Sequence, residues 1–538
     1  MYNFAADFIH YVHMKPTFYS LLLFLLILPQ SLRADWNDAA SNVQITPTGI
    51  QFLDPEMQCT PDGYTYCYWC MSGSEGTMAY RVQIIDPNGA RVCRTAGLTV
   101  CNEPGITWTK VNYPTMVDSD GNFIIACTDL RYQDKDAGQY YSYTIYKINR
   151  AGEVLWGTTL NDSIGMYEAA HITMAQDAAG NYVFAYATAM GSYADRYVQV
   201  ERLSADGTPL FDHPVKIEDA VNHQLTYPTI MPMQDGDAML VMHNYSTGEY
   251  ILQRLDADCQ PRWQEPVTVY AGGYTSQYVW DCVDVRQLAD TTFTLAVIDG
   301  NKDLLFVNMD CNGNNLIYDA DYRRVAKADY ATSLGDFYYD ATGEVINVAF
   351  RQIDADDSYT HGIFVQQMAT DGSWLLEDEG NAVIDIQRQD QYGYVACRAT
   401  DKADEMAVFY IKKEGTGYIS AAQCYITRYN YDGECVMQPV AFTASDYSKS
   451  SLQVSQLIDN QYYLCSWLEK RGTAEYNSVY LQRVYLDGSV ELALEHVRSD
   501  EAQQSTVLYD LQGRSYADAS ARELAHGIYV AHGQKIMK

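Results

Sequence analysis

A short pattern of apolar and polar residues recurs eight times along the chain, and its last copy is Tyr480-Leu-Gln-Arg-Val-Tyr-Leu-Asp-Gly488. Each copy ends in a turn, and we call the last residue of that turn the anchor. Successive anchors lie 52 to 63 residues apart. They are Gly89, Gly152, Gly207, Cys259, Gly313, Gly372, Gly433 and Gly488. A repeat of this period indicates an array of similar structural units.

Two positions of the pattern are apolar in every copy, seven and four residues before the anchor. Residues an odd number apart on a strand point to opposite faces, so both faces of each strand must be covered. The earlier position holds Val82, Ile145, Val200, Leu252, Phe306, Val365, Ile426 and Leu481. The later position holds Ile85, Ile148, Leu203, Leu255, Met309, Met368, Tyr429 and Val484. Most copies end in Asp-Gly or Asn-Gly, which favours a strand followed by a hairpin turn over a helix.

A second turn and a second apolar run precede each copy, as in Asp118-Ser-Asp-Gly121 before the run from Phe123 to Cys127. Each unit therefore has an innermost strand, a turn, a core strand, a variable loop, the recurring pattern, a turn and a last strand. Such last strands often carry a Trp, as at Trp156, Trp263 and Trp374. The unit has four antiparallel strands with no helical periodicity between them.

Repeated four-stranded units of this length predict an all-β protein, a single β-propeller of about eight four-stranded antiparallel blades over residues 42–498. Closure into a ring removes the exposed edge strands of an open array. Seven blades remain an alternative if the first unit completes another blade, and two smaller propellers are a weaker one. Because Cys259 replaces the anchor Gly, we expect altered geometry at that turn.

The N-terminal residues 1–34 have the pattern of a secretory signal peptide. Lys15 precedes the apolar run from Leu21 to Leu28, and we expect cleavage near Ala34. Residues 1–13 carry no Lys or Arg, so Met14 is the expected initiator. The run is too short to span a bilayer, and no other stretch reaches transmembrane length.

The net charge narrows the range of expected partners. The 36 basic and 69 acidic residues give a net charge of −33, which disfavours nucleic acid and anionic membranes as partners.

Thirteen Cys in an exported chain permit disulfides, and Cys93 with Cys101 or Cys424 with Cys435 could each bridge a hairpin. Cys67-Tyr-Trp-Cys70 has no second pair, so no metal site or cofactor is expected.

The C-terminal residues 499–538 contain three motifs in order: Val507-Leu-Tyr-Asp-Leu-Gln-Gly-Arg514, Gly527-Ile-Tyr-Val530 and Gly533-Gln-Lys-Ile-Met-Lys538. This tail resembles the C-terminal sorting signal of proteins exported by type IX secretion. The motifs themselves predict three short strands with glycine turns. The resemblance covers about 32 residues and implies that the secretion machinery reads the tail as an address, after which the tail is removed or attached at the cell surface. It departs from the family in length, because the residues after Gly488 must first finish a blade. If the tail is not functional, the protein would remain in the periplasm.

Candidate ligand-binding residues lie where loops converge on one mouth of the channel, since binding residues concentrate on loops. They are Trp108, Tyr113, Arg131, His171, Tyr227, Trp280 and Arg351. Aromatic rings could stack on sugars while charged groups bind hydroxyls. For any single Tyr of the 46, packing between blades is the favoured explanation.

Three functions remain open, and no catalytic residue is assigned. The leading hypothesis is an exported, non-enzymatic propeller that binds glycan or protein at its mouth. The alternative is a glycan-active hydrolase or lyase there, for which a sialidase-like site would need an arginine cluster. Arg131 and Arg351 fit, without a convincing third member. A scaffold without a small ligand is the third. No nucleophile elbow, zinc-protease motif or phosphate loop is present.

Overall fold

The structure is a computed structural model, and its described residues form strands and turns without any helix. They are residues 36, 39–48, 53–72, 77–104, 114–131, 142–160, 172–189, 196–219, 224–273, 275, 283–288, 292–299, 303–325, 330–377, 380–415, 421–490, 508–510, 515–516, 528–531 and 534–537. Within these ranges, nothing has the helical length and apolarity needed to cross a membrane. The chain divides into two compact units, residues 1–490 and 491–538.

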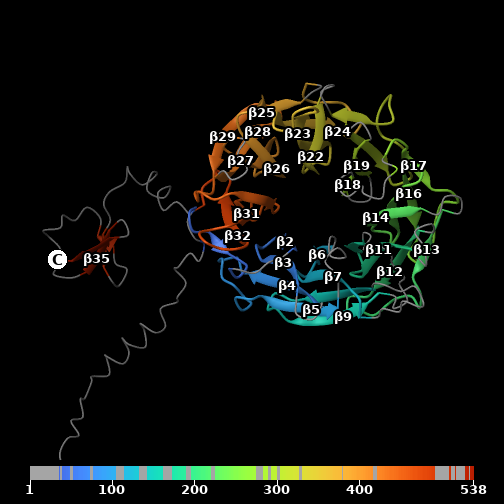
Figure 1. Ribbon diagram of the computed structural model, residues 1–538, viewed down its shortest axis with the longest axis horizontal. Coiled ribbons are helices and arrows are strands. Elements are labelled where there is room, and N and C mark those ends of the chain that lie inside the picture. The colour runs from blue at the N-terminus through green and yellow to red at the C-terminus, as the bar shows by residue number, and fades with distance from the viewer. Residues whose placement is uncertain are drawn as a thin grey trace, which may run out of the picture. The chain divides into compact units, whose positions relative to one another are not determined.

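Eight four-stranded antiparallel sheets form the blades of one ring (Figure 1). Blade 1 contains β2 (Leu53–Cys59), β3 (Thr65–Ser72), β4 (Thr77–Ile85) and β5 (Leu98–Pro104). Blade 2 contains β6 (Thr115–Val117), β7 (Phe123–Asp129), β8 (Ser142–Ile148) and β9 (Val154–Thr159). Blade 3 contains β10 (Ile172–Gln176), β11 (Tyr182–Ala189), β12 (Arg196–Leu203) and β13 (Val215–Ile217). Blade 4 contains β14 (Leu225–Pro232), β15 (Ala238–Asn244), β16 (Glu249–Leu255) and β17 (Val267–Tyr270).

The remaining blades complete the ring. Blade 5 contains β18 (Val283–Leu288), β19 (Thr292–Ile298), β20 (Leu304–Asp310) and β21 (Arg323–Val325). Blade 6 contains β22 (Tyr330–Tyr339), β23 (Val345–Asp354), β24 (His361–Ala369) and β25 (Asn381–Gln387). Blade 7 contains β26 (Gln391–Ala399), β27 (Glu405–Lys413), β28 (Ala422–Asn430) and β29 (Cys435–Ala441). Blade 8 contains β30 (Lys449–Val454), β31 (Tyr462–Glu469), β32 (Ser478–Tyr485) and β1 (Val43–Gln44). The predicted eight-bladed propeller is confirmed, and seven blades or two smaller rings are wrong.

The N-terminal strand β1 closes the ring by supplying the outer strand of blade 8. Val43 lies opposite Leu481 and Gln44 opposite Tyr480 in the antiparallel ladder between β1 and β32. The expectation that residues after Gly488 finish a blade is therefore wrong, because that position is already occupied. Because the first and last strands of the propeller share this sheet, the ring cannot open at blade 8 without breaking the ladder between β1 and β32.

The two apolar positions of the recurring pattern lie on the third strand of every blade and are buried in all eight. Their side chains enter different cores. Val82 packs with Phe123 in the core between blades 1 and 2, whereas Ile85 packs with Ile458 in the core between blades 8 and 1. Eight such cores, one for each interface between neighbouring blades, hold the ring together.

A polar seam joins neighbouring blades at the position five residues before the anchor, which often holds a basic residue. Arg202 pairs with Asp177 of its own blade at 3.2 Å, and its Nη2 donates to the Gly236 carbonyl of the next blade at 2.8 Å. Lys147 likewise contacts Asp118 at 3.0 Å and donates to Tyr182 of the next blade at 2.8 Å. Arg254, Arg428 and Arg483 also donate to carbonyls of the following blade.

Three local expectations differ from the structure. Cys259 adopts a φ of 60° in the same left-handed turn as the anchor glycines, so the altered geometry expected there is wrong. Trp156 lies in β9, but Trp263 and Trp374 precede β17 and β25. No disulfide joins any two of the twelve described cysteines. The register places Cys435 opposite Tyr429 and Cys101 opposite Tyr80, so neither suggested pair forms.

The second unit is one small antiparallel sheet in the order β34-β33-β35-β36. Its strands are β33 (Leu508–Asp510), β34 (Ser515–Tyr516), β35 (Ile528–Ala531) and β36 (Gln534–Met537). Each of the three tail motifs contributes one strand, β33, β35 or β36, as expected, and β34 adds a fourth strand directly after the first motif.

Candidate functional site

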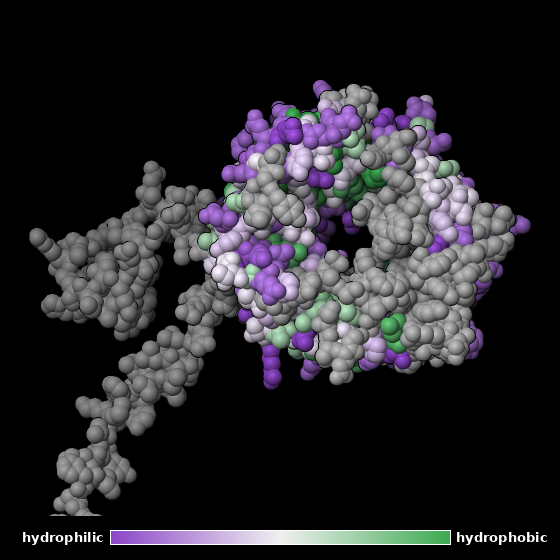
Figure 2. Space-filling model, in the orientation of Figure 1, coloured by the Kyte–Doolittle hydropathy of each residue, from purple (hydrophilic) through white to green (hydrophobic). Residues whose placement is uncertain are grey.

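Innermost strands of five blades enclose a cavity of about 580 Å³ along the wall of the central channel. Its lining comes from β2, β18, β22, β26 and β30, each the first strand of its blade. Figure 2 shows the opening at the centre of the ring. A second cavity of about 510 Å³ shares Gly335, Val395 and Leu452 with the first. The two cavities therefore form adjoining parts of one candidate site.

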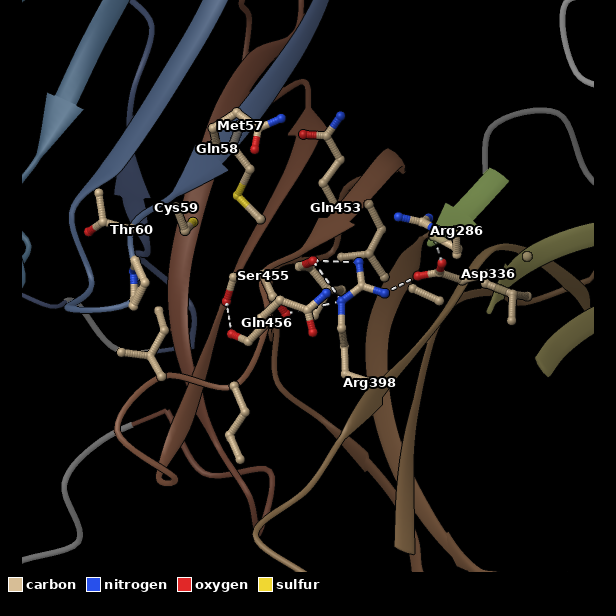
Figure 3. Close-up of a pocket in the computed structure, with 18 of the residues that line it drawn as sticks. Met57, Gln58, Cys59, Thr60, Arg286, Asp336, Arg398, Gln453, Ser455 and Gln456 are labelled. Carbon is tan, nitrogen blue, oxygen red and sulfur yellow. Dashed lines mark hydrogen bonds and ion pairs between the residues drawn. The ribbon is translucent and has the colours of Figure 1, made fainter. Parts of the chain in front are cut away.

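Four charged side chains meet in the first cavity. Asp336 on β22 pairs with Arg398 on β26 and, at 3.3 Å, with Arg286 on β18 (Figure 3). The same Nη2 atom of Arg286 contacts Asp284 at 2.8 Å. Two arginines thus balance two carboxylates, and both carboxylates approach one guanidinium. Three neighbouring blades contribute to this group, so its geometry depends on the closed ring.

Arg398 is fixed more firmly than Arg286. Its Nη2 donates to the Val454 carbonyl at 2.7 Å, and its Nε is 3.1 Å from the Val454 and Ser455 carbonyls. Burial and the nearby charge of Arg286 lower the pKa of Arg398 to about 10. Arg398 is therefore still protonated at neutral pH, and it ties β26 to β30. By contrast, the Arg286 side chain is 45% exposed, so it is the accessible cation of the group.

The second cavity combines a cation with an exposed aromatic ring. Arg351 on β23 and Tyr394 on β26 both line it, and Tyr394 is 51% exposed. Tyr394 lies at a register shift in β26 and has a φ of 53°, which is unusual for a residue other than Gly. Bulges of this kind redirect side chains and are common beside functional sites. An exposed ring beside a cation suits a ligand with both apolar and polar faces.

Arg351 is held by a short chain of hydrogen bonds. Its Nη1 donates to the Tyr392 carbonyl at 2.7 Å, and the Tyr392 amide donates to Nε2 of His361 at 2.9 Å. Burial is the largest cause lowering the pKa of His361, so its ring is neutral at neutral pH. A neutral ring with Nε2 as acceptor leaves Nδ1 to donate to the Ser358 carbonyl, 3.1 Å away.

Of the three predicted ligand-binding residues that the structure describes, one lies at these cavities. Arg351 lines the second cavity, whereas Tyr227 occupies a bulge of β14 with its ring 6.1 Å from that of His243. Arg131 contacts Asp129 and Tyr146 of its own blade and Cys101 of β5. Arg131 and Arg351 belong to blades 2 and 6, on opposite sides of the ring, so they do not form one arginine cluster. Trp108, Tyr113, His171 and Trp280 lie outside the described residues.

Sequence reasoning missed Arg286, Arg398, Asp284 and Asp336. It looked for binding residues in loops, but these four lie within or beside the innermost strands. Asp284-Val-Arg286 does carry a signal, because two charges two residues apart on one strand face the same side. If β18 had been recognised as an innermost strand, both charges would have been expected to face the channel.

Neither a protein-family model nor a curated protein matches the sequence. Several solved structures resemble the chain at low identity. A PL25 ulvan lyase matches at 11% identity and TM-score 0.42, covering 85% of this chain and 98% of its own. The polysaccharide lyase Uly1 matches at 12% and 0.39, covering 84% and 92%. A eukaryotic initiation factor matches at 10% and 0.39, covering 84% and 94%. These likenesses are too weak to assign a function, and a propeller fold serves unrelated functions.

Proposed function

We propose that the protein is a glycan-active enzyme, a hydrolase or lyase, which binds a sugar chain along the wall of its channel. The observation that carries this proposal is the meeting of Asp284 and Asp336 at Arg286, in a cavity adjoining the exposed ring of Tyr394. Sugar rings offer apolar faces for stacking and hydroxyls for charged groups. Polysaccharide lyases are among the similar solved structures. The preference for an enzyme over a non-enzymatic binder rests on Asp284, Asp336 and Tyr394.

The charges suggest different roles for the two carboxylates. Asp336 contacts two arginines, which keep a carboxylate ionised. Asp284 contacts only Arg286 among the described residues and its side chain is 35% exposed. Asp284 is therefore the more accessible base or nucleophile, and Asp336 positions Arg286. A carboxylate that acts as a base or nucleophile is one member of the usual catalytic pair in glycoside hydrolases.

Replacing Asp284 with Asn should lower the rate of glycan cleavage by about a hundred-fold or more, the usual contribution of a catalytic acid or base. Binding of the sugar chain should change little, because the amide keeps the shape of the carboxylate. The measurement begins with a panel of polysaccharides incubated with the wild-type protein, followed by chromatography of released oligosaccharides. The cleavage rate of the variant is then measured on any polysaccharide that the wild-type protein cleaves.

Asp319→Asn is the matched control. Asp319 also pairs with a single arginine, Arg323 at 2.9 Å, but its side chain is 65% exposed and lies outside both cavities. This variant should retain full activity. Glycan binding without product from any chain would sink the enzymatic proposal and favour the non-enzymatic binder instead. Equal loss of activity in both variants would remove Asp284 from the mechanism.

We further propose that residues 1–34 direct export and that the C-terminal unit acts as a sorting signal. The apolar run after Lys15 and the three tail motifs support this proposal. The tail is also a separate compact unit from residue 491 onward, as suits an address that is recognised or removed independently. The protein would then be secreted or displayed on the cell surface.

A chain ending at Ser505 should accumulate in the periplasm, because it lacks all three tail motifs. Cell fractionation with immunoblotting would locate it beside the full-length chain in the same exporting host. The propeller should still fold, since every blade strand lies before residue 490. Undiminished surface delivery of the shortened chain would contradict a sorting role for the tail.

A further inference from the structure

Arg351 is the one charged residue among the described residues that line the second cavity. The others are Ser333, Leu334, Gly335, Gly393, Tyr394, Val395 and Leu452. Within the described ranges, no carboxylate lies within ion-pair distance of Arg351, whereas Arg286 and Arg398 each contact Asp336. The two cavities therefore differ in charge. The first is balanced, and the second carries a net positive charge.

The hydrogen bonding of Arg351 leaves part of its guanidinium available. Its one hydrogen bond to the described residues uses Nη1, which donates to the Tyr392 carbonyl at 2.7 Å. The Nε and Nη2 groups form the edge that binds carboxylates through two parallel hydrogen bonds. Gly393 leaves space beside the guanidinium, because a Cβ built there would lie 3.8 Å from Nη1.

Burial lowers the pKa of Arg351, so its cation is poorly solvated. Neutral His361 adds no charge next to it, and no acid in the described lining compensates it. A desolvated cation without a counter-charge is a costly arrangement that a bound anion relieves. The protein as a whole has a net charge of −33 and repels anions at long range, so the local contacts of Arg351 must account for binding of an anion.

We propose that Arg351 binds the carboxylate of an acidic sugar, so that the chain held in the channel is a uronate-containing glycan. This inference rests on the proposed function and deepens it. Tyr394 lines the same cavity and offers its exposed ring to the apolar face of that sugar. The charged residues around Arg286 in the adjoining cavity then contact the neighbouring sugars of the glycan.

Arg351→Gln should weaken binding of trigalacturonate by about ten-fold to a hundred-fold, as expected for the loss of a charge-assisted hydrogen bond. The fully methyl-esterified trisaccharide should bind the wild-type protein as weakly as trigalacturonate binds the variant. Arg351→Lys should recover only part of the affinity, because an ammonium group keeps the charge but not the two parallel donors. Isothermal titration calorimetry on the full chain measures all three.

Arg388→Gln is the control, since Arg388 belongs to the same blade and its side chain is 68% exposed in an ion pair with Asp357. It should leave affinity unchanged. Equal binding of the acid and its ester, or no effect of Arg351→Gln, overturns the inference while glycan cleavage at Asp284 still stands. Preference for a sulfated neutral trisaccharide overturns the carboxylate assignment. Failure of every glycan to bind overturns both proposals.

Discussion

A chain that begins after Thr48 should lose about 5 kcal/mol or more of its free energy of unfolding, because the ring can no longer close. The lost segment includes Val43 and Ile45, both buried against blade 8. It also includes the hydrogen bond from the Ile45 amide to the Val479 carbonyl at 2.8 Å. Without β1, strand β32 becomes an exposed edge that can pair with another chain. Thermal unfolding and size-exclusion chromatography would report both effects.

The matched control is a chain that begins at Asp35, which keeps β1 and removes only the predicted signal peptide. It should unfold at the temperature of the processed protein. A point variant tests the same closure without a truncation. Ile45→Ala should cost about 2–5 kcal/mol, whereas Leu155→Ala on the outer strand β9, where Leu155 is exposed, should change stability by less than about 0.5 kcal/mol. Equal stability of the chains beginning at Asp35 and after Thr48 would contradict closure by β1.

The blade repeat could be predicted from the sequence because it rests on local patterns repeated many times. An odd spacing between apolar residues requires two buried faces, and Val82 and Ile85 do enter the cores on either side of blade 1. Ring closure could not be predicted in the same way. Strand β1 has only two residues, Val43 and Gln44, and it pairs with a strand more than 430 residues away. No local pattern specifies such a partner.

The candidate site was harder to predict for a related reason. Arg351 could be chosen because it directly follows the apolar run from Val345 to Phe350, but the alternation that brings Arg286 and Asp284 to one side occurs in any strand. Only the arrangement of blades shows that β18, β22 and β26 face a common channel.

The polar seam between blades had a visible signal in the sequence, a basic residue five positions before several anchors. Its acidic partners, such as Asp177, lie in a different turn of the repeat.

Replacing Glu469 with Gln should cost about 3–5 kcal/mol, because it leaves a buried charge without its partner. Glu469 and Lys449 are both completely buried, with Nζ and Oε1 3.8 Å apart. Glu469 also contacts Arg471 at 3.0 Å and accepts a hydrogen bond from the Trp467 indole at 2.9 Å. Burial already lowers the pKa of Lys449, so removing the nearby negative charge makes its ammonium still less favourable. Chemical denaturation at pH 7 measures the loss.

Glu218→Gln provides the comparison, since Glu218 pairs with Lys216 but both side chains are well exposed. That variant should lose less than about 1 kcal/mol, as surface pairs do. The double variant Lys449→Met with Glu469→Gln should be more stable than Glu469→Gln alone, because no buried ammonium remains. Lys449 also donates to the Ala422 and Ser445 carbonyls at 2.6 and 2.8 Å, so recovery should be incomplete. If Glu469→Gln behaved like Glu218→Gln, the three carbonyl acceptors of Lys449, including that of Tyr447, would suffice to hold its charge in blade 8.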